Sequence, residues 1–84
     1  MIHLTIYSRP GCHLCDDMKA VVNNVARTFH LAPVDVVEID ISGDAALEAQ
    51  YGLEIPVLMV EGKKAAKYRI EEGALIRLLT TRAL

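Results

Sequence analysis

The only two cysteines of this chain, Cys12 and Cys15, lie where the hydrophobic pattern changes from that of a strand to that of a helix. Upstream, every second residue from Ile2 to Ile6 is apolar, which predicts a half-buried strand that ends near Tyr7. Downstream, apolar residues recur at helical spacing; they are Leu14, Met18, Val21, Val25 and Phe29. The cysteine pair is therefore predicted at the N-terminus of an amphipathic helix that directly follows a strand.

The next segment predicts a second strand parallel to the first. Pro33 forbids a continuation of the helix, because proline lacks an amide hydrogen and its ring clashes with the preceding turn. Val37, Ile39 and Ile41 then alternate with acidic residues, as in a strand. A strand, a helix and a strand in this order imply parallel pairing through a right-handed crossover.

A short helix is expected next. Either Ser42 or Asp44 can cap its N-terminus. The helix would extend over Ala45–Tyr51, and Gly52 suits the left-handed position that ends many helices.

The last part of the chain predicts a hairpin and a final helix. The apolar run Val57–Val60 is typical of a strand covered on both faces, and the turn at Glu61–Lys63 leads back into a strand over Lys64–Tyr68. Glu71 and Glu72 place negative charge in the first turn of a helix. Its expected buried stripe is Leu75, Leu78 and Leu79. The order βαβαββα, without linker or repeat, predicts one α/β domain over residues 1–84.

The composition of the chain excludes several classes of function. With 84 residues, 52% of them apolar, the chain can fold around one core without covalent staples. The net charge of -2, with both signs interspersed, gives neither the basic stripe that binds nucleic acid nor a polybasic membrane patch. The longest apolar run, Ile55–Val60, is far too short to span a bilayer. We expect a cytoplasmic monomer that binds neither nucleic acid nor membranes.

The placement of the cysteines predicts thiol chemistry. At the first turn of a helix, the Cys12 sulfur can accept hydrogen bonds from the amides of Leu14 and Cys15, and it lies at the positive end of the helix dipole. Both effects stabilise the thiolate, so we expect the pKa of Cys12 to lie below the value of about 8.5 of a free thiol. Cys15, one turn deeper on the same face, is then the resolving thiol. The expected reaction is thiol–disulfide exchange with Cys12 as the nucleophile.

Neighbouring side chains modify this expectation. Arg9 and the protonated form of His13 would favour the thiolate, whereas Asp16 and Asp17 oppose it unless the helix holds them away. We expect the net effect to lower the pKa of the nucleophile. Leu14, between the cysteines, either presents an apolar surface to the substrate or packs under the start of the helix, and the sequence leaves both interpretations open.

The dipeptide Ile55-Pro56 is the second candidate element of the site. Proline is tolerated in a sheet mainly at strand starts and edges. A cis bond here would leave the backbone of Ile55 free to pair with an extended segment of the substrate, with the Pro56 ring against the sulfurs. A trans proline at a loop-to-strand boundary is the commoner case, but the position relative to the cysteine pair favours the cis form.

The alternative function is a noncatalytic metal or iron–sulfur cluster carrier that uses the same cysteine pair. Zinc normally takes four ligands, and besides the cysteines the chain offers only His3, His13 and His30. A complete zinc site within one chain is therefore not expected. A small copper-carrying ferredoxin-like domain would end in a strand, whereas this chain is expected to end in a helix. A cluster bridged by Cys12 from two copies of the chain stays open.

The segments Tyr7–Cys15 and Glu54–Val57, followed by Gly62, resemble the glutaredoxin family, in particular its glutaredoxin-like branch of small thioredoxin-fold proteins. The resemblance covers essentially the whole chain. It implies a four-stranded mixed sheet flanked by three helices. It also implies the roles of the residues: Cys12 as nucleophile, Cys15 as resolving cysteine and Pro56 as a cis-proline beside them.

Two departures from the family pattern bear on the co-substrate. Glutaredoxins usually have a proline and an aromatic residue between the cysteines, where this chain has His13 and Leu14. They also have a Gly-Gly pair and a downstream aspartate that hold glutathione, where this chain has Ala66-Lys67 and Ile70. Arg9 matches a basic residue of the family that can meet a carboxylate of glutathione or of a protein.

These features together predict an enzyme of electron transport. We expect a thiol–disulfide oxidoreductase without a bound cofactor, which reduces protein disulfides or glutathione mixed disulfides. Its reductant would be glutathione or a protein thiol, and the loss of the glutathione-holding residues suggests the protein thiol. Arg9, His13, Leu14, Ile55 and Pro56 are the expected substrate-binding residues.

Overall fold

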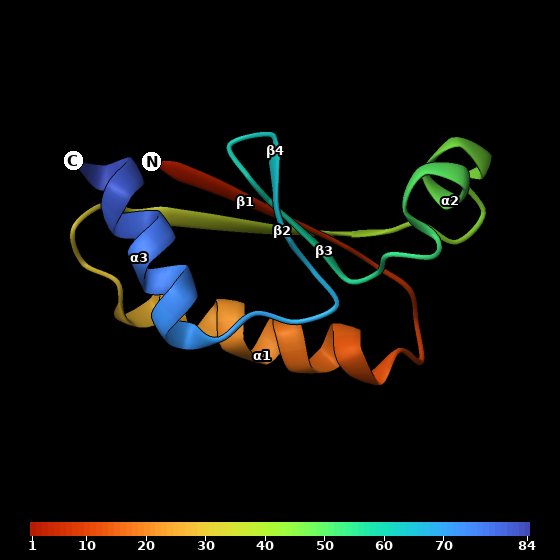
Figure 1. The fold of residues 1–84 in the computed structure, drawn as a ribbon, viewed down its shortest axis with the longest axis horizontal. Coiled ribbons are helices and arrows are strands. Elements are labelled where there is room, and N and C mark those ends of the chain that lie inside the picture. The colour runs from red at the N-terminus through yellow and green to blue at the C-terminus, as the bar shows by residue number, and fades with distance from the viewer.

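The computed structural model describes all 84 residues and has seven elements in the order βαβαββα (Figure 1). They are β1 (Ile2–Ser8), α1 (His13–Thr28), β2 (Val34–Asp40), α2 (Ala45–Tyr51), β3 (Val57–Val60), β4 (Lys63–Lys67) and α3 (Glu72–Ala83). The predicted fold class and order of elements are confirmed. None of these helices combines the length and the apolar character that crossing a bilayer requires.

The four strands form one mixed sheet in the order β2-β1-β3-β4. β1 is parallel to β2, as the strand–helix–strand pattern predicted, and antiparallel to β3. β3 and β4 form an antiparallel hairpin that contains an irregularity in register at Leu58 and Met59. The hairpin strand β4 is therefore at the edge of the sheet, and it begins and ends one residue earlier than predicted.

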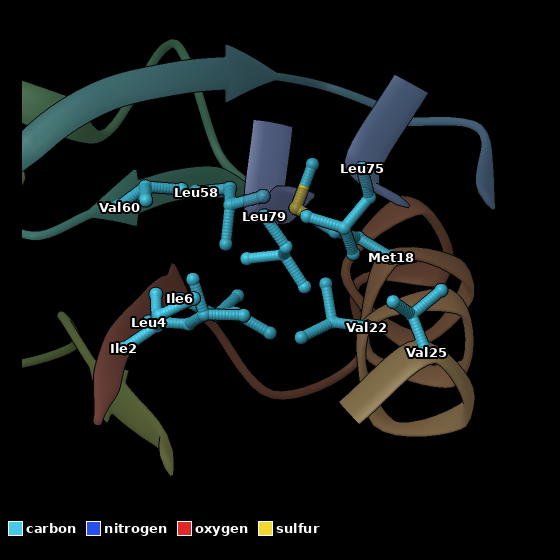
Figure 2. Packing of buried hydrophobic residues seen from close by; sticks show 10 residues of the cluster. All are labelled: Ile2, Leu4, Ile6, Met18, Val22, Val25, Leu58, Val60, Leu75 and Leu79. Carbon is cyan, nitrogen blue, oxygen red and sulfur yellow. The ribbon is translucent and has the colours of Figure 1, made fainter. Parts of the chain in front are cut away.

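The main core lies between the sheet and the pair α1 and α3, which cover the same face (Figure 1). Alternate residues of β1 point into this core, where they meet one stripe of each helix (Figure 2). The core comprises Ile2, Leu4, Ile6, Met18, Val22, Val25, Leu58, Val60, Leu75 and Leu79.

The helical stripes differ in detail from the prediction. In α1 the buried residues are Cys15, Met18, Val22 and Val25, so Val22 replaces the predicted Val21. Leu14 is 40% exposed and Leu78 of α3 is 37% exposed, so neither belongs to the core. Cys15 rather than Leu14 lies on the buried face of α1, and Leu79 rather than Leu78 lies on the buried face of α3.

A smaller cluster on the opposite face of the sheet holds α2. Ile41, Tyr51 and Val57 are buried there, and the ring of Tyr51 stacks on that of Tyr7 with centroids 4.4 Å apart. Because α2 covers only one end of this face, Val37 in the middle of β2 is 46% exposed. β3 is covered on both faces as predicted, with Val57 facing α2 and its neighbour facing the main core.

The structure identifies the residue that caps the start of α2 and corrects the predicted conformation at its end. Asp44, rather than Ser42, is the N-cap, and its carboxylate accepts the amide hydrogen of Leu47 at 3.0 Å. Gly52 has right-handed backbone angles, φ -55 and ψ -32, so the predicted left-handed end is wrong. Glycine is required there for space, because a Cβ atom on Gly52 would lie 2.5 Å from the carbonyl oxygen of Glu48.

Candidate active site

The strand register brings several chain segments to one end of the sheet. The last residues of β1 pair with the first residues of β3, with Tyr7 opposite Val57. Val57 in turn lies opposite Lys67 at the end of β4. Since α1 begins shortly after β1, the turn that carries the cysteines, the start of β3 and the end of β4 all lie at this end (Figure 1).

The turn between β1 and α1 presents Cys12 at the start of the helix. Gly11 has φ +75, a backbone conformation that residues with a Cβ atom rarely adopt. Cys12 is the N-cap of α1, and its sulfur accepts the amide hydrogen of Cys15 at 3.1 Å. The amide of Leu14, which was also expected to donate, makes no such hydrogen bond. The Cys12 sulfur thus takes the place that a serine or aspartate oxygen occupies in an ordinary helix cap.

The two cysteines form a disulfide and differ in exposure. Their Cα atoms are 5.2 Å apart, within the range of ordinary disulfides. Cys15 is fully buried under the first turn of α1, whereas Cys12 is half-buried at the surface. An incoming sulfur can therefore reach Cys12 before it reaches Cys15.

The residues between and after the cysteines are exposed. His13 and Leu14 both face the solvent beside Cys12, which favours the interpretation of Leu14 as an apolar contact surface over that of a packed residue. The carboxylate of Asp16 lies 3.4 Å from the amino group of Lys19, and Asp17 has no ion-pair partner. The opposing charge of Asp16 is thus partly neutralised within α1.

Arg9 has a partner within the chain. Its guanidinium donates to both carboxylate oxygens of Glu48 on α2, with Nη2–O distances of 2.7 Å and an Nε–Oε1 distance of 3.2 Å. This two-point ion pair joins the turn before Cys12 to α2, and both side chains stay more than a third exposed. Sequence reasoning found Arg9 but missed Glu48, because nothing in the sequence pairs residues from a turn and a distant helix.

The start of β3 leaves a backbone segment without partners. The Ile55–Pro56 bond is cis, and Pro56 is fully buried. The Pro56 carbonyl accepts the amide hydrogen of Tyr68 at 2.8 Å, which extends the hairpin ladder toward the cysteines. Neither the amide nor the carbonyl of Ile55 makes a hydrogen bond within the chain.

A charged cluster that sequence reasoning missed lies on the other side of the cysteine turn. The buried hydroxyl of Ser8 donates to Glu38 at 2.9 Å, and the amino group of Lys19 lies 2.8 Å from the same carboxylate oxygen. The hydrogen bond from Lys19 lowers the pKa of Glu38, and the hydrogen bond to Glu38 raises the pKa of Lys19. The cluster borders a cleft of about 330 Å³ that also contains Arg9 and Pro10.

Of the three histidines, His13 lies exposed between the cysteines, and the other two have contacts elsewhere. His3 lies 3.6 Å from Asp35, and the Nδ1 atom of His30 lies 3.2 Å from the carbonyl of Thr28. No group of three or more histidine, cysteine and acidic side chains comes together in the chain. A cluster bridged between two copies of the chain would take Cys12 of each copy as its ligand.

The positions that correspond to the glutathione-holding residues of glutaredoxins lie along the end of β4. Ala66 and Ile70 are half-buried and pack against the main core, and Lys67 is exposed. Tyr68 has φ +71 between them. The chain thus brings Cys12, Cys15, Arg9 and the Ile55–Pro56 bond to one end of the sheet, with different side chains where the family has its glycines and aspartate.

Comparison with known proteins assigns this chain to a family. The profile of the glutaredoxin-like domain (DUF836) matches residues 3–80. The chain belongs to this family. It is 30% identical over 83 residues to the glutaredoxin-like protein YDR286C homolog of Dictyostelium discoideum, and the match covers 95% of this chain and 77% of that protein.

Solved structures of similar proteins support the same assignment. The X-ray structure of protein XcR50 from X. campestris is similar, with a TM-score of 0.75 and 32% identity over 93% of this chain and 96% of that one. The solution structure of Ne2328 from Nitrosomonas europaea has a TM-score of 0.74 and 26% identity, with coverage of 92% and 89%. A mutant thioredoxin from Halobacterium salinarum, at 24% identity and a TM-score of 0.68, covers 99% of this chain and 75% of its own and shares the fold.

The fold and family are thus those of a glutaredoxin-like thioredoxin-fold protein. A cysteine pair with two intervening residues, at disulfide distance at the start of α1, supports a redox function for this member of the family.

Proposed function

We propose that this protein is a thiol–disulfide oxidoreductase in which Cys12 attacks the substrate and Cys15 resolves the intermediate. The observation that carries the proposal is the half-exposed Cys12 sulfur at the N-cap of α1, bonded to the Cys15 amide and directly above the buried Cys15. An amide hydrogen and the helix dipole both stabilise a thiolate at this position.

The reaction transfers two electrons in two displacements. The Cys12 thiolate attacks one sulfur of the substrate disulfide, and the other substrate sulfur leaves as a thiolate that takes up a proton. Cys15 then loses its proton and attacks the Cys12 sulfur, which releases the second substrate thiol and leaves the Cys12–Cys15 disulfide. An external thiol, either glutathione or a protein thiol, reverses these steps and restores the two thiols.

The surrounding residues have separate roles in this proposal. The amide and carbonyl of Ile55, which have no partner in the chain, would pair with an extended segment of the substrate next to its disulfide. Pro56 fixes the direction of that backbone segment, and Leu14 offers an exposed apolar contact beside Cys12. Arg9 is proposed to position the turn through Glu48 and to exchange this partner for a substrate carboxylate.

The test compares substrates and reductants with the purified, reduced protein. Insulin and a glutathione mixed disulfide of a cysteine peptide serve as substrates, with glutathione or a thioredoxin system as the reductant. We expect disulfide reduction that requires Cys12 with at least one of these pairs. Stoichiometric metal or cluster in the purified protein, together with no reduction of either substrate, would contradict the proposal and favour the carrier function.

A further inference from the structure

The largest cavity of the protein is a groove between the edge strand β4 and helix α3, with a volume of about 950 Å³. Its strand side is formed by Ala65 and Ala66, and its helix side includes Ala74. Ala65 has no partner across the hairpin, since Lys64 pairs with Met59 and Ala66 with Leu58. Short side chains on both walls leave this space open.

The groove is rich in arginine. Arg69, Arg77 and Arg82 line it, and Glu71 is the single acidic residue among its lining. None of the three arginines takes part in an ion pair of the protein. Because the whole chain has a net charge of -2, this concentration of free positive charge is local.

One end of the groove lies next to the backbone of Ile55 and Pro56, where the substrate is proposed to bind. Arg69 follows Tyr68, whose amide donates to the carbonyl of Pro56 at 2.8 Å. Arg77 and Arg82 follow along α3. The groove therefore leads away from the cysteine end of the sheet along the open edge of β4.

The edge strand and the arginines fit one kind of occupant. β4 pairs only with β3, so its outer edge is open to an added extended segment. Every second side chain of such a segment would lie on the α3 face of the sheet, with a repeat of about 6.7 Å. Arg69, Arg77 and Arg82 all line the space between β4 and α3. Carboxylates at alternate positions of an extended segment would meet them.

We propose that the substrates are proteins in which an extended segment with acidic residues at alternate positions adjoins the reactive disulfide. This segment binds in the β4–α3 groove and pairs with Arg69, Arg77 and Arg82. The inference rests on the proposed function, because it names the substrate class of the same site.

The experiment uses cysteine peptides whose single sulfur is held in a mixed disulfide with thionitrobenzoate. The Cys12 thiolate attacks the peptide sulfur, and coloured thionitrobenzoate leaves as a thiolate; Cys15 then displaces the peptide thiol and leaves the protein oxidised. One peptide has aspartate at alternate positions on both sides of its cysteine, and its partner has lysine there. We expect the aspartate peptide to release thionitrobenzoate about tenfold faster at low salt, with a smaller difference at high salt.

The variant Arg77→Glu should reduce that preference to less than about twofold, because it reverses the charge at the centre of the groove. Arg27→Glu is the matched control: Arg27 is exposed at the end of α1, outside the groove, and should leave the preference unchanged. Equal rates for the two peptides, or a preference that survives Arg77→Glu, would overturn the inference.

A binding measurement separates this inference from the function on which it rests. Fluorescein-labelled peptides with serine in place of cysteine are titrated with the oxidised protein, and anisotropy reports binding. Binding of the aspartate peptide that depends on Arg77, without exchange of any cysteine peptide, would refute the reductase function and support the groove. Stronger Arg77-dependent binding of a thymidine oligonucleotide than of the aspartate peptide would refute the peptide assignment.

Discussion

At the scale of single residues, the two sulfurs are distinguished by their surroundings. The Cys12 sulfur has an amide donor and partial access to solvent, whereas Cys15 is enclosed by the core. Burial without a donor favours the neutral thiol, and a donor at a helix N-terminus favours the thiolate. Under the proposed function, this difference in surroundings would make Cys12 the attacking sulfur and leave Cys15 to resolve the intermediate.

The first prediction concerns the division of roles between the cysteines. Cys12→Ser should abolish disulfide reduction, because the attacking sulfur is lost. Cys15→Ser should still attack and should accumulate as a mixed disulfide with the substrate, since the resolving thiol is missing. Intact-protein mass spectrometry after mixing with a peptide disulfide measures the adduct. An adduct of equal yield on Cys12→Ser would contradict the assignment of Cys12 as the specific attacking sulfur.

The second prediction concerns the ion pair of Arg9 and Glu48. Because both side chains are more than a third exposed, their coupling should contribute only about 0.5–1 kcal/mol to the free energy of unfolding. A double-mutant cycle with Arg9→Gln and Glu48→Gln, followed by urea unfolding, measures this coupling. A coupling free energy of zero would mean that the pair does not hold the turn to α2.

At the scale of elements, helix α2 is attached to the sheet by few contacts near the site. Tyr51 stacks on Tyr7 of β1, and Glu48 pairs with Arg9 of the cysteine turn. Gly52 allows the chain to pass close to the carbonyl of Glu48 at the end of the helix. Substitutions in α2 should therefore alter the conformation of the turn before Cys12.

The third prediction compares two glycines with different surroundings. Gly52→Ala should destabilise the protein by about 1–3 kcal/mol, because the added Cβ would lie 2.5 Å from a backbone oxygen. Gly73→Ala in the first turn of α3 should instead stabilise it by up to about 1 kcal/mol, since the nearest atom would be Arg77 Nη1 at 3.6 Å. Thermal unfolding of both variants measures the difference. Similar melting temperatures would contradict the spatial role of Gly52.

Local sequence patterns predict the elements well here because each pattern is strong. The alternation in β1 and the apolar run of β3 match their burial in the sheet. The pattern could not choose between Val21 and Val22, which depends on where α1 begins and on how α3 packs against it. The pattern placed the end of α2 but not the backbone conformation of Gly52, which depends on how closely the chain passes the carbonyl oxygen of Glu48 in the folded protein.

At the scale of the whole molecule, several carboxylates have acquired partners on other elements through folding. Lys19 of α1 pairs with Glu38 of β2, and Lys64 of β4 pairs with Glu54 before β3. The hydrogen bond from each lysine lowers the pKa of its carboxylate below the ordinary value of 4.5. The folded protein therefore binds fewer protons than the unfolded chain in mildly acidic solution.

The fourth prediction follows from this difference. Because the folded pKa values of these carboxylates are lowered, their contribution to stability is present above their ordinary pKa of 4.5 and is lost as the pH falls below it. Glu38→Gln should lose less stability than the wild type between about pH 6 and about pH 3, as measured by thermal unfolding. Glu61→Gln at the exposed hairpin turn is the control. Parallel pH curves for Glu38→Gln and the wild type would contradict the pairing.

The sequence predicts only those parts of the site whose residues are close together in the chain. Cys12 is the N-cap of α1 and Cys15 lies in its first turn, so their spacing and the helix start were enough to place them. Glu38 and Glu48 come to the cysteine turn from β2 and α2 through tertiary packing, and no local pattern signals this. The groove lined by Arg77 likewise depends on α3 lying along the edge strand.

The most direct test measures the ionisation of Cys12 itself. In Cys15→Ser, which keeps the amide at that position, the rate of alkylation by iodoacetamide is followed across pH. An unfolded peptide with the sequence of residues 8–16 and the same substitution gives the reference. We predict an apparent pKa for Cys12 at least about one unit below that of the peptide, whose thiol should titrate near about 8.5. The same pKa in protein and peptide would contradict an activated nucleophile at the start of α1.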